Sequence, residues 1–467
     1  MSKAESIYPY LPIALQNAAC SWHGRQENKK RFGAEFNRLF NHFCSTDWMD
    51  ETAIAGYKKS RLAARLLGAK NNAFYSEWIG RFSNHEIAQF PFDVLNELPI
   101  LQKEDVIKNY DRIADAKHRK TFSVKTSGTT GKALQLLKTD IDFSAQWAIW
   151  FRHRSRFGIE WGDTSVNFTG KPVVPGNQRK PPFWRYNHYQ NQHLISMQAV
   201  KPENIYAIVE FLNTISPTFY SGYPSILAEV SRLALEAKLP LLAASRPKAI
   251  FCGAEKLLGY QRELIETWTR SLITDQYGLT EGNCNFSRCE MGNYHEDFEF
   301  CHVEVAPIEA GAPPGVGRLV GTGFYSDAFP LIRYDTGDIA TIDPEASCSC
   351  GRRSRVISEI DGRVDDFVLT TDGRRVMRFD YLFKDTFDIR EVQIIQRVSG
   401  QIVVSAALRP GADTKRFEST VCDRIAIYIS PNMKAVFEYV DTIPRTGAGK
   451  FKAVVNLLAP HERIQRA

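Results

Sequence analysis

The regular alternation of amphipathic and apolar segments between residues 201 and 281 constrains the fold of this chain more than any other feature. The amphipathic segments have the spacing of helices, and the short apolar segments between them are typical of buried strands. The expected helices are Pro202–Asn213, Ile226–Ala237 and Leu258–Thr269, and the expected strands are Thr218–Tyr220, Lys248–Cys252 and a segment that begins at Leu272. Such alternation favours a parallel α/β sheet, in which ligands bind beyond the carboxyl ends of the strands.

Polar loops that contain glycine follow three of the expected strands. Gly253-Ala254-Glu255 comes directly after the strand that ends at Cys252, and Tyr277–Glu281 follows the next strand. A third loop, Ser127–Lys132, follows a short strand at Thr121–Val124. Because the carboxyl ends of parallel strands meet at one edge of a sheet, we expect these three loops to share one rim.

The stretch Lys125–Lys132, which contains the third loop, has two glycines, four hydroxyl side chains and two lysines. Glycines let backbone N–H groups approach an anion closely, hydroxyls add donors, and lysines add positive charge. This composition suits a triphosphate, although only two residues separate Gly128 from Gly131, where the common phosphate loop requires four. A Ser/Thr/Gly-rich turn between two strands is the alternative interpretation.

The N-terminal third of the chain has a different pattern. Residues 1 to about 100 are expected to be mostly helical, because apolar residues recur there at helical spacing. A helix is also expected over residues 140–157, and its basic end, Arg152, Arg154 and Arg156, is interpreted as a solvated C-terminal turn. Residues 170–190 are rich in proline, aromatic and basic residues, and such a long loop suits either a lid over a substrate or a surface excursion.

After residue 300 the pattern turns to strands, including one at Pro330–Tyr334, and Asp335–Asp338 is interpreted as a turn with two carboxylates. Residues 360–366 have the composition of a junction, and short strands and a helix follow it. We therefore expect an α/β protein of two domains. The large domain, residues 1–362, would hold mostly parallel sheets, helices and a strand-rich part, and residues 363–467 would form a small mobile α+β domain.

The composition argues against several classes of protein. The 467 residues carry 59 basic and 53 acidic side chains without long runs of one sign, which disfavours a dedicated nucleic-acid-binding or membrane-surface protein. No stretch approaches the ~18 apolar residues of a membrane span, and the N-terminal residues lack the apolar core of a signal peptide. Nine scattered cysteines fit a reducing compartment, so we expect a cytoplasmic protein, either a monomer or a homodimer.

Five stretches, in their order along the chain, resemble the motifs of the adenylate-forming superfamily of acyl-CoA synthetases, peptide-synthetase adenylation domains and luciferases. They are Thr126–Lys132, Tyr277–Glu281, Arg333–Asp338, Gly362–Asp366 and Pro444–Lys450. Within this superfamily the chain is similar to the phenylacetate–CoA ligase and CapK-like branch. The stretches that carry the narrower likeness are Tyr220–Ser225, Gly253–Lys256 and Cys348–Arg352, and the resemblance covers residues 90 to 460.

The resemblance implies ATP-dependent adenylation, which joins a carboxylate to the α-phosphate of ATP and releases pyrophosphate. Two anions must be brought together, so positive charge and N–H donors are needed at the phosphates. The implied phosphate-binding residues are Ser127, Gly128, Thr129, Thr130, Gly131 and Lys132, and those around the adenine are Gly253, Ala254, Glu255, Tyr277 and Gly278. Thr280 would donate to the α-phosphate, and Glu281 would ligate Mg²⁺, a cation that prefers oxygen. Asp338, with Arg363 beside it, would accept hydrogen bonds from the ribose hydroxyls.

Two further roles are implied for the C-terminal part of the chain. Lys450 would reach into the site from the small domain and bridge the carboxylate and the phosphate in the transition state. Asp365 would lie at the hinge about which the small domain swings between adenylation and the second half-reaction. The structural alternative for Lys450 is a mobile lysine, and the alternative for Asp365 is a solvated Asp-Asp turn.

A possible structural zinc site is formed by Cys289, His295, Cys348 and Cys350. Three cysteines and a histidine are a common tetrahedral set for zinc, although the spacing here differs from the usual C-x2-C knuckles. The CapK-like branch resembles this arrangement, which implies a zinc ion that joins the loop after the Mg²⁺ ligand to the strands before the hinge. Cys284 and Cys301 are nearby alternative ligands, and reduced side chains without a metal are the remaining alternative.

The second half-reaction transfers the acyl group to an acceptor. Coenzyme A is the usual acceptor in the superfamily, so the first expectation is a thioester of an aryl or arylacetic acid. The loop Phe367–Gly373 is about one residue longer than expected for such a ligase, and CapK-like relatives suggest an amine acceptor, for example in surface-polysaccharide or natural-product biosynthesis. The aromatic residues that would either line an aryl pocket or belong to the core are Phe143, Trp147, Trp184, Tyr186, Tyr220 and Tyr223.

Two functions from other classes make different predictions. A phosphotransferase or NTPase that uses Ser127–Lys132 as a phosphate loop would release ADP and inorganic phosphate, whereas adenylation releases AMP and pyrophosphate. A non-catalytic zinc module that binds nucleic acid would need a basic stripe and would bind in a salt-dependent way. The spacing of the loop argues against the first function, and the scattered charge argues against the second.

Overall fold

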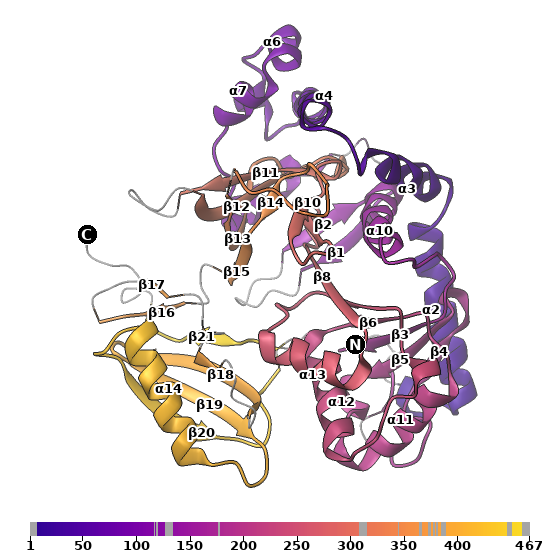
Figure 1. The fold of residues 1–467 in the computed structure, drawn as a ribbon. Coiled ribbons are helices and arrows are strands. Elements are labelled where there is room, and N and C mark those ends of the chain that lie inside the picture. The colour runs from indigo at the N-terminus through magenta and orange to yellow at the C-terminus, as the bar shows by residue number, and fades with distance from the viewer. Residues whose placement is uncertain are drawn as a thin grey trace.

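The computed structural model describes residues 7–115, 117, 120–126, 134–175, 178–307, 315–343, 345–363, 367–371, 375–376, 379, 382–383, 389–445 and 451–459; the side chains of residues 361–363, 375 and 428 are outside this description. Figure 1 shows a large part built on several sheets, with a small C-terminal part, in yellow, beside it. The structure is therefore the mixed α/β fold that the sequence predicts.

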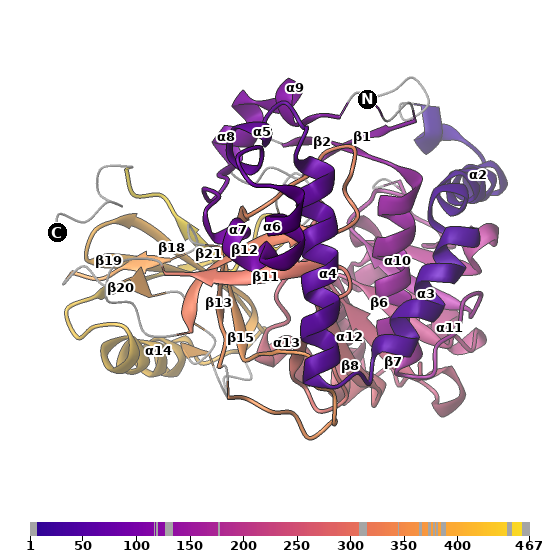
Figure 2. The ribbon, with the colours of Figure 1, turned by 90° about the horizontal axis from the view of Figure 1, so that it is seen from above.

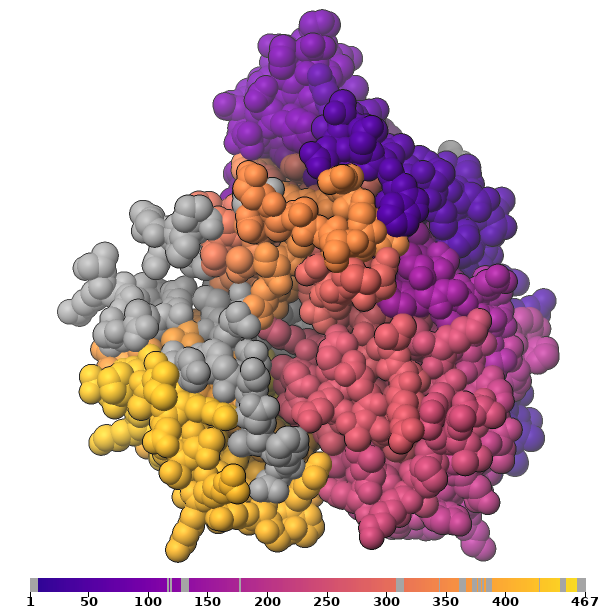
Figure 3. Space-filling model, viewed as in Figure 1, coloured from indigo at the N-terminus to yellow at the C-terminus, as the bar shows by residue number. Residues whose placement is uncertain are grey.

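Three long helices begin the chain, as the helical spacing predicts. They are α2 (Ile13–Arg31), α3 (Ala34–Thr46) and α4 (Glu51–Ala69); the shorter helices that follow are α5 (Ser76–Ile79), α6 (Asn84–Gln89), α7 (Pro91–Asn96), α8 (Lys103–Lys108) and α9 (Tyr110–Ile113). Phe36, Leu39 and Phe43 bury one face of α3. Figure 2 shows α4 lying across strands of the later, strand-rich part, and Figures 1 and 3 show α4, α6 and α7 in a projecting lobe.

The centre of the large part is a nine-stranded sheet with the order β14-β10-β9-β8-β7-β6-β3-β5-β4. Its strands are β3 (Ser165–Thr169), β4 (Arg185–Asn187), β5 (Gln192–Ser196), β6 (Phe219–Gly222), β7 (Ala249–Cys252), β8 (Leu272–Gly278), β9 (Asn285–Arg288), β10 (Tyr294–Glu296) and β14 (Val356–Ile357). The neighbours β5, β3, β6, β7 and β8 are parallel. The connecting helices are α11 (Ile205–Thr214), α12 (Pro224–Glu236) and α13 (Gly259–Thr269), which confirms the predicted parallel α/β sheet.

The strand before the glycine-rich loop belongs to another sheet. β1 (Phe122–Lys125) and β2 (Gln135–Lys138) form a separate antiparallel hairpin. The expectation that all three polar loops end strands of one sheet is therefore wrong for this loop. Ser127–Lys132 itself lies outside the described residues.

The strand-rich part is a four-stranded antiparallel sheet of β11 (Cys301–Ala306), β12 (Val316–Gly323), β13 (Tyr334–Thr341) and β15 (Glu359–Arg363). Asp335–Asp338 lies inside β13, so its interpretation as a turn is wrong, and the strand expected at Pro330 begins only at Tyr334. β13 is paired on both sides, and this pairing overrides the local preference for a turn. The strand keeps a turn-like irregularity at this point. The Gly337 N–H donates to Asp335 Oδ1 at 2.9 Å, and Gly337 has φ +75°.

The helix expected over residues 140–157 is α10 (Asp140–Ser155), but its basic end is not solvated. The buried Arg152 guanidinium donates to Asp297 Oδ1 and Glu299 Oε1, both at 2.5 Å. Arg154 lies over neighbouring aromatic rings, and Arg156 pairs with the aspartate that follows α3. The interpretation as a solvated helix end is wrong, because α3 and the connection after β10 cover this turn with carboxylates.

The segment 170–190 packs against the N-terminal helix α2 and ends in β4 and a 3₁₀ turn, His188–Gln190. The side chain of Arg185 is fully buried, and it donates to Gln16 Oε1 at 2.6 Å and to Gln178 Oε1 at 2.7 Å. The described residues of this segment therefore fit a packed surface excursion, and the interpretation as a lid stays a prediction.

The small part has its own sheet, with the order β20-β19-β18-β21. Its elements are β18 (Ile389–Val398), β19 (Gln401–Leu408), α14 (Thr414–Tyr428), β20 (Lys434–Tyr439) and β21 (Val454–Asn456), and the short hairpin β16 (Val368–Leu369) and β17 (Arg375–Val376) precedes them. These strands and the helix confirm the elements expected for a small α+β unit. The boundary between residues 362 and 363 stays a prediction.

Candidate active site

Two loops that the sequence singles out lie next to each other at the carboxyl edge of the central sheet. β7 and β8 are parallel neighbours, with Cys252 opposite Asp275. Gly253-Ala254-Glu255 therefore leaves the sheet beside the end of β8 at Tyr277 and Gly278. Ala254 has φ +66°, an uncommon conformation for a residue with a side chain, so the chain turns sharply there. Such a rim is where open α/β sheets bind their ligands.

The end of β8 is tied to the strand-rich sheet by a hydrogen bond between two predicted site residues. The Tyr277 hydroxyl donates to Asp338 Oδ2 at 2.5 Å. Asp338 is 7% exposed and lies opposite Arg363 in the pairing of β13 with β15. Burial, and then the charge of Asp338, raise the pKa of Tyr277 well above its ordinary value, so the hydroxyl stays protonated and able to donate. Asp338 and the backbone of Arg363, both predicted at the ribose, are thus neighbours, and Tyr277, predicted at the adenine, bonds to Asp338.

We expect Tyr277→Phe to raise the KM for ATP by about tenfold or more, because the hydroxyl fixes the carboxylate that would bind the ribose; a hydrogen bond to a charged group is worth about 1.5–3 kcal/mol. Tyr294→Phe is the matched control, since the Tyr294 hydroxyl also donates to a buried aspartate, Asp275, but within the sheet. Both variants should lose a similar amount of stability in urea unfolding, and only the first should change the KM for ATP. An equal KM in both variants would contradict this role for Asp338.

The turn after β8 has a buried cation behind it. Thr280 is exposed and Glu281 is partly buried. The ammonium of Lys138, at the end of β2, lies 3.0 Å from the position that a Cβ would take on the next residue, Gly282. Burial lowers the pKa of Lys138, and the nearby carboxylates of Asp142 and Glu281 act in the opposite direction. Lys138 and Asp142 were not predicted from the sequence, although their spacing of four residues around the start of α10 was a signal.

The small domain contacts the large one at the loop after β7. The Phe451 N–H donates to Glu255 Oε1 at 2.5 Å, and the other oxygen of this carboxylate accepts the N–H of Ser225 at 3.3 Å. Burial raises the pKa of Glu255, although both hydrogen bonds act to lower it. Because Phe451 follows Lys450 directly, the chain next to the predicted catalytic lysine meets a loop predicted to surround the adenine.

Several predicted site residues cannot be placed. Ser127, Gly128, Thr129, Thr130, Gly131 and Lys132, the hinge residue Asp365 and the lysine Lys450 lie outside the described residues, and of Arg363 the backbone alone is described.

The six aromatic residues proposed for either an aryl pocket or the core belong to different parts of the structure. Trp147 packs against the core beneath α10, whereas Trp184 and Tyr220 belong to the core of the nine-stranded sheet. Trp184 stacks on Phe211 with 3.8 Å between ring centroids. Tyr223 is partly buried, and burial, then the charge of Glu255, raise its pKa, so Tyr223 lies near the loop after β7.

The four residues predicted to bind zinc converge, although more than 50 residues separate the two pairs in the sequence. One ligand atom from each of Cys289, His295, Cys348 and Cys350 lies within 4.8 Å of the others. The Sγ atoms of Cys289 and Cys348 are 3.6 Å apart, and Cys350 Sγ is 3.4 Å from His295 Nε2. His295 Nδ1 lies 3.2 Å from the carbonyl oxygen of Ser354, which suits an Nδ1–H donor and leaves Nε2 free for a metal. The donor set and its compactness fit a tetrahedral zinc ion.

The surroundings of this cluster tie it to the rest of the large part. Arg352, two residues after Cys350, donates to Asp47 Oδ2 and to Glu290 Oε1, both at 3.0 Å. Cys284 and Cys301, named as alternative ligands, are buried in the apolar core and do not belong to the cluster. The cluster thus joins the β9–β10 turn to the segment before β14.

Residues 368–457 match the model of the CapK C-terminal domain family. Over 453 residues, 96% of this chain and 98% of the relative, the sequence is 26% identical to Protein CapK of Staphylococcus aureus. The chain is a homologue of CapK. This CapK homologue is also 33% identical to the phenylacetate-coenzyme A ligase of Thermus thermophilus over 124 residues, which are 25% of this chain and 28% of that enzyme.

The fold of the CapK homologue is that of the adenylate-forming ligases. Compared with the crystal structure of 2-hydroxyisobutyryl-CoA ligase in the postadenylation state, in complex with R3-HIB-AMP, it has a TM-score of 0.69 at 17% identity, over 89% of this chain and 92% of that one. Compared with the same enzyme in the thioesterification state, in complex with 2-HIB-AMP and CoA, the TM-score is 0.55 at 19% identity, over 88% and 91% of the chains. These comparisons confirm the resemblance to the superfamily and to its CapK-like branch.

Among the helices of the described residues, none is long and apolar enough to cross a membrane.

Proposed function

We propose that this CapK homologue is an ATP-dependent ligase that adenylates a carboxylic acid and releases pyrophosphate. The observation that carries the proposal is the contact of Phe451 with Glu255, because it brings the chain beside Lys450 to the rim where the Tyr277–Asp338 pair lies. In this proposal Asp338 accepts hydrogen bonds from the ribose hydroxyls, and Thr280 donates a hydrogen bond to the α-phosphate. Lys450 bridges the α-phosphate and the substrate carboxylate. Lys138 lies behind the turn and balances part of the charge of Glu281.

Mg²⁺ belongs to this proposal as the counterion of the ATP phosphates. Glu281 would hold it, since a partly buried carboxylate at the end of a strand is a suitable oxygen ligand. The metal would neutralise charge on the phosphates, while Thr280 and the backbone of the turn orient the α-phosphate.

Coenzyme A is the first proposed acceptor of the acyl group. Support comes from the matched ligases, of which one is described with an acyl-AMP and CoA together. The higher TM-score to the postadenylation state supports an arrangement of the two domains suited to the first half-reaction, so the second would need the small domain to rotate.

An amine is the alternative acceptor. It is favoured by the similarity to CapK along 96% of the chain, which is far more extensive than the match to the phenylacetate-coenzyme A ligase. The hairpin of β16 and β17, whose joining loop is longer than expected for a CoA ligase, also supports it.

ATP–pyrophosphate exchange over a panel of carboxylic acids tests the adenylation step. At least one acid should support exchange, and AMP should be formed in place of ADP. The acceptor is then identified by adding CoA, or a panel of amines, to the enzyme loaded with that acyl adenylate and following release of AMP. A lack of exchange with every acid would remove the support for adenylation.

We further propose that Cys289, His295, Cys348 and Cys350 hold a structural zinc ion. Protein purified without added metal should contain about one zinc per chain, because a complete Cys₃His set binds zinc tightly. Cys350→Ser should lower both the zinc content and the unfolding temperature, whereas Cys422→Ser, at an exposed cysteine on α14, should leave both unchanged. Less than half a zinc per chain in the wild-type protein would refute the site.

A further inference from the structure

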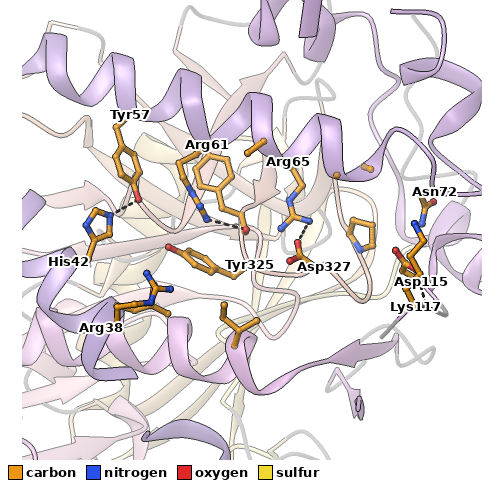
Figure 4. Close-up of a pocket in the computed structure, with 17 residues that line it drawn as sticks. Arg38, His42, Tyr57, Arg61, Arg65, Asn72, Asp115, Lys117, Tyr325 and Asp327 are labelled. Atoms are coloured by element: carbon orange, nitrogen blue, oxygen red, sulfur yellow. Dashed lines mark hydrogen bonds and ion pairs between the residues drawn. The ribbon is translucent and has the colours of Figure 1, made fainter. Parts of the chain in front are cut away.

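A cavity lies between the N-terminal helices and the strand-rich sheet, and none of the residues proposed to bind ATP lines it. Its volume is about 530 Å³, within the range of small-molecule sites. It is lined by side chains of α3 and α4 and by the segment Phe324–Pro330 that follows β12. Figure 4 shows Arg61 and Arg65 extending from α4 toward Tyr325 and Asp327 across this cavity.

Arg65 contributes a buried positive charge whose hydrogen bonds are incomplete. Its side chain is 4% exposed, and Nη1 lies 2.8 Å from Asp327 Oδ1. Among the described residues, its Nε and Nη2 have no hydrogen-bond partner. The carboxylate of Asp327 is more than half exposed, so it neutralises the guanidinium incompletely. Because buried polar groups are nearly always paired, these two donors indicate a ligand or ordered water in the cavity.

Arg61, one helical turn before Arg65, is held in place by aromatic rings. Its guanidinium lies 4.7 Å from the ring centroid of Tyr325 and 5.5 Å from that of Phe324, and Nη2 donates to the Phe324 carbonyl oxygen at 3.3 Å. Within the described part of the chain, Arg61 forms no ion pair, and its buried Nε has no partner. A guanidinium fixed by stacking keeps its charge and its remaining donors available to an anion.

The other ionisable groups around the cavity add to the positive charge. Arg38 and Lys117 are exposed at the edge of the cavity. Arg38 also forms an ion pair with Glu35, with 2.8 Å between Nη2 and Oε2. His42 bonds to the Tyr57 hydroxyl at 3.0 Å, and burial and then Arg61 and Arg38 lower the pKa of this histidine, so it is neutral near pH 7. Two carboxylates, Asp115 and Asp327, face the four cations Arg38, Arg61, Arg65 and Lys117.

We propose that this cavity is a binding site for an anionic small molecule, held through a phosphate or carboxylate group by Arg61, Arg65 and Arg38. Guanidinium groups suit both kinds of anion, and the rings of Phe324 and Tyr325 would contact the organic part. The site adjoins the proposed catalytic turn, because a Cβ on Gly323 would lie 2.6 Å from the Gly282 carbonyl oxygen. The proposal does not depend on adenylation activity.

The test is calorimetric titration of the full-length protein with inorganic phosphate and, separately, with citrate at constant ionic strength. A non-hydrolysable ATP analogue is present in excess, so that the nucleotide site is filled. The wild-type protein should bind one equivalent of at least one probe. Binding of phosphate alone identifies a phosphorylated ligand, and binding of citrate alone identifies a carboxylate.

Two variants and a control assign the binding to this cavity. Arg61→Gln should weaken binding at least tenfold, as expected for the loss of charge-assisted hydrogen bonds. Arg38→Gln, at an exposed position that should not affect folding, should weaken it about threefold to tenfold. Arg81→Gln, at an exposed arginine outside the cavity, should leave it unchanged. The proposal is overturned if neither probe binds, or if Arg38→Gln and Arg61→Gln both bind the probe as the wild type does.

Discussion

Lys450→Ala is expected to reduce acyl-adenylate formation by about a hundredfold or more without unfolding the protein. In the proposed reaction the lysine ammonium stabilises negative charge that develops between the carboxylate and the α-phosphate, and loss of one such group typically costs about 10²–10³ in rate. The neighbouring Phe451 is bonded to Glu255 through its backbone, so the side chain at position 450 can be removed without loss of that contact.

The measurement is ATP–pyrophosphate exchange with an acid identified by the panel described above, together with a thermal unfolding curve. Lys434→Ala is the control, because Lys434 lies on the outer strand β20 of the same small domain and is exposed. Exchange by Lys450→Ala at more than half of the wild-type rate would contradict the proposed role. A lower unfolding temperature of this variant would show that the loss reflects folding.

Arg152→Met is expected to destabilise the large part by about 3–5 kcal/mol. The arginine is almost fully buried, and it pairs with Asp297 and Glu299 at 2.5 Å; removal of one partner of a buried ion pair leaves carboxylates without compensation. Methionine fills a similar volume, so the effect would come mainly from the lost charge.

Urea unfolding, monitored by tryptophan fluorescence, checks this result. Arg81→Met removes an exposed ion pair with Glu97, and it should change the stability by less than about 1 kcal/mol. Equal midpoints for the two variants would mean that the network around Arg152 does not stabilise the fold.

Features that depend on local pattern could be predicted from the sequence. The alternation after residue 201 predicted the parallel sheet, since the helical and strand periods are properties of adjacent residues. The Cys and His residues of the proposed zinc site converge because β10 pairs with β14 close to the two distant cysteines. Their residue types, together with the resemblance to the CapK-like branch, pointed to one cluster without information on this pairing.

Features that depend on what packs against an element could not be predicted in this way. The basic end of α10 has the pattern of a solvated helix terminus, and only the position of Asp297 and Glu299 shows that Arg152 is buried. Asp335–Asp338 has the composition of a turn, but pairing with two neighbouring strands makes it part of β13. Lys138 ends an ordinary short strand, and its place behind the proposed catalytic turn comes from a hairpin outside the main sheet.

The polar contacts that join the small domain to the large one have an energetic consequence. Among the described residues they are the Phe451–Glu255 hydrogen bond and two ion pairs, Arg390 with Glu229 at 3.8 Å and Arg409 with Glu236 at 4.0 Å. Each partly exposed pair is worth at most about 1 kcal/mol. These described contacts would then contribute at most a few kcal/mol to docking, a size that a bound nucleotide with modestly different affinity for the docked and released arrangements could offset. Glu255, which contacts both domains, would stabilise the docked arrangement.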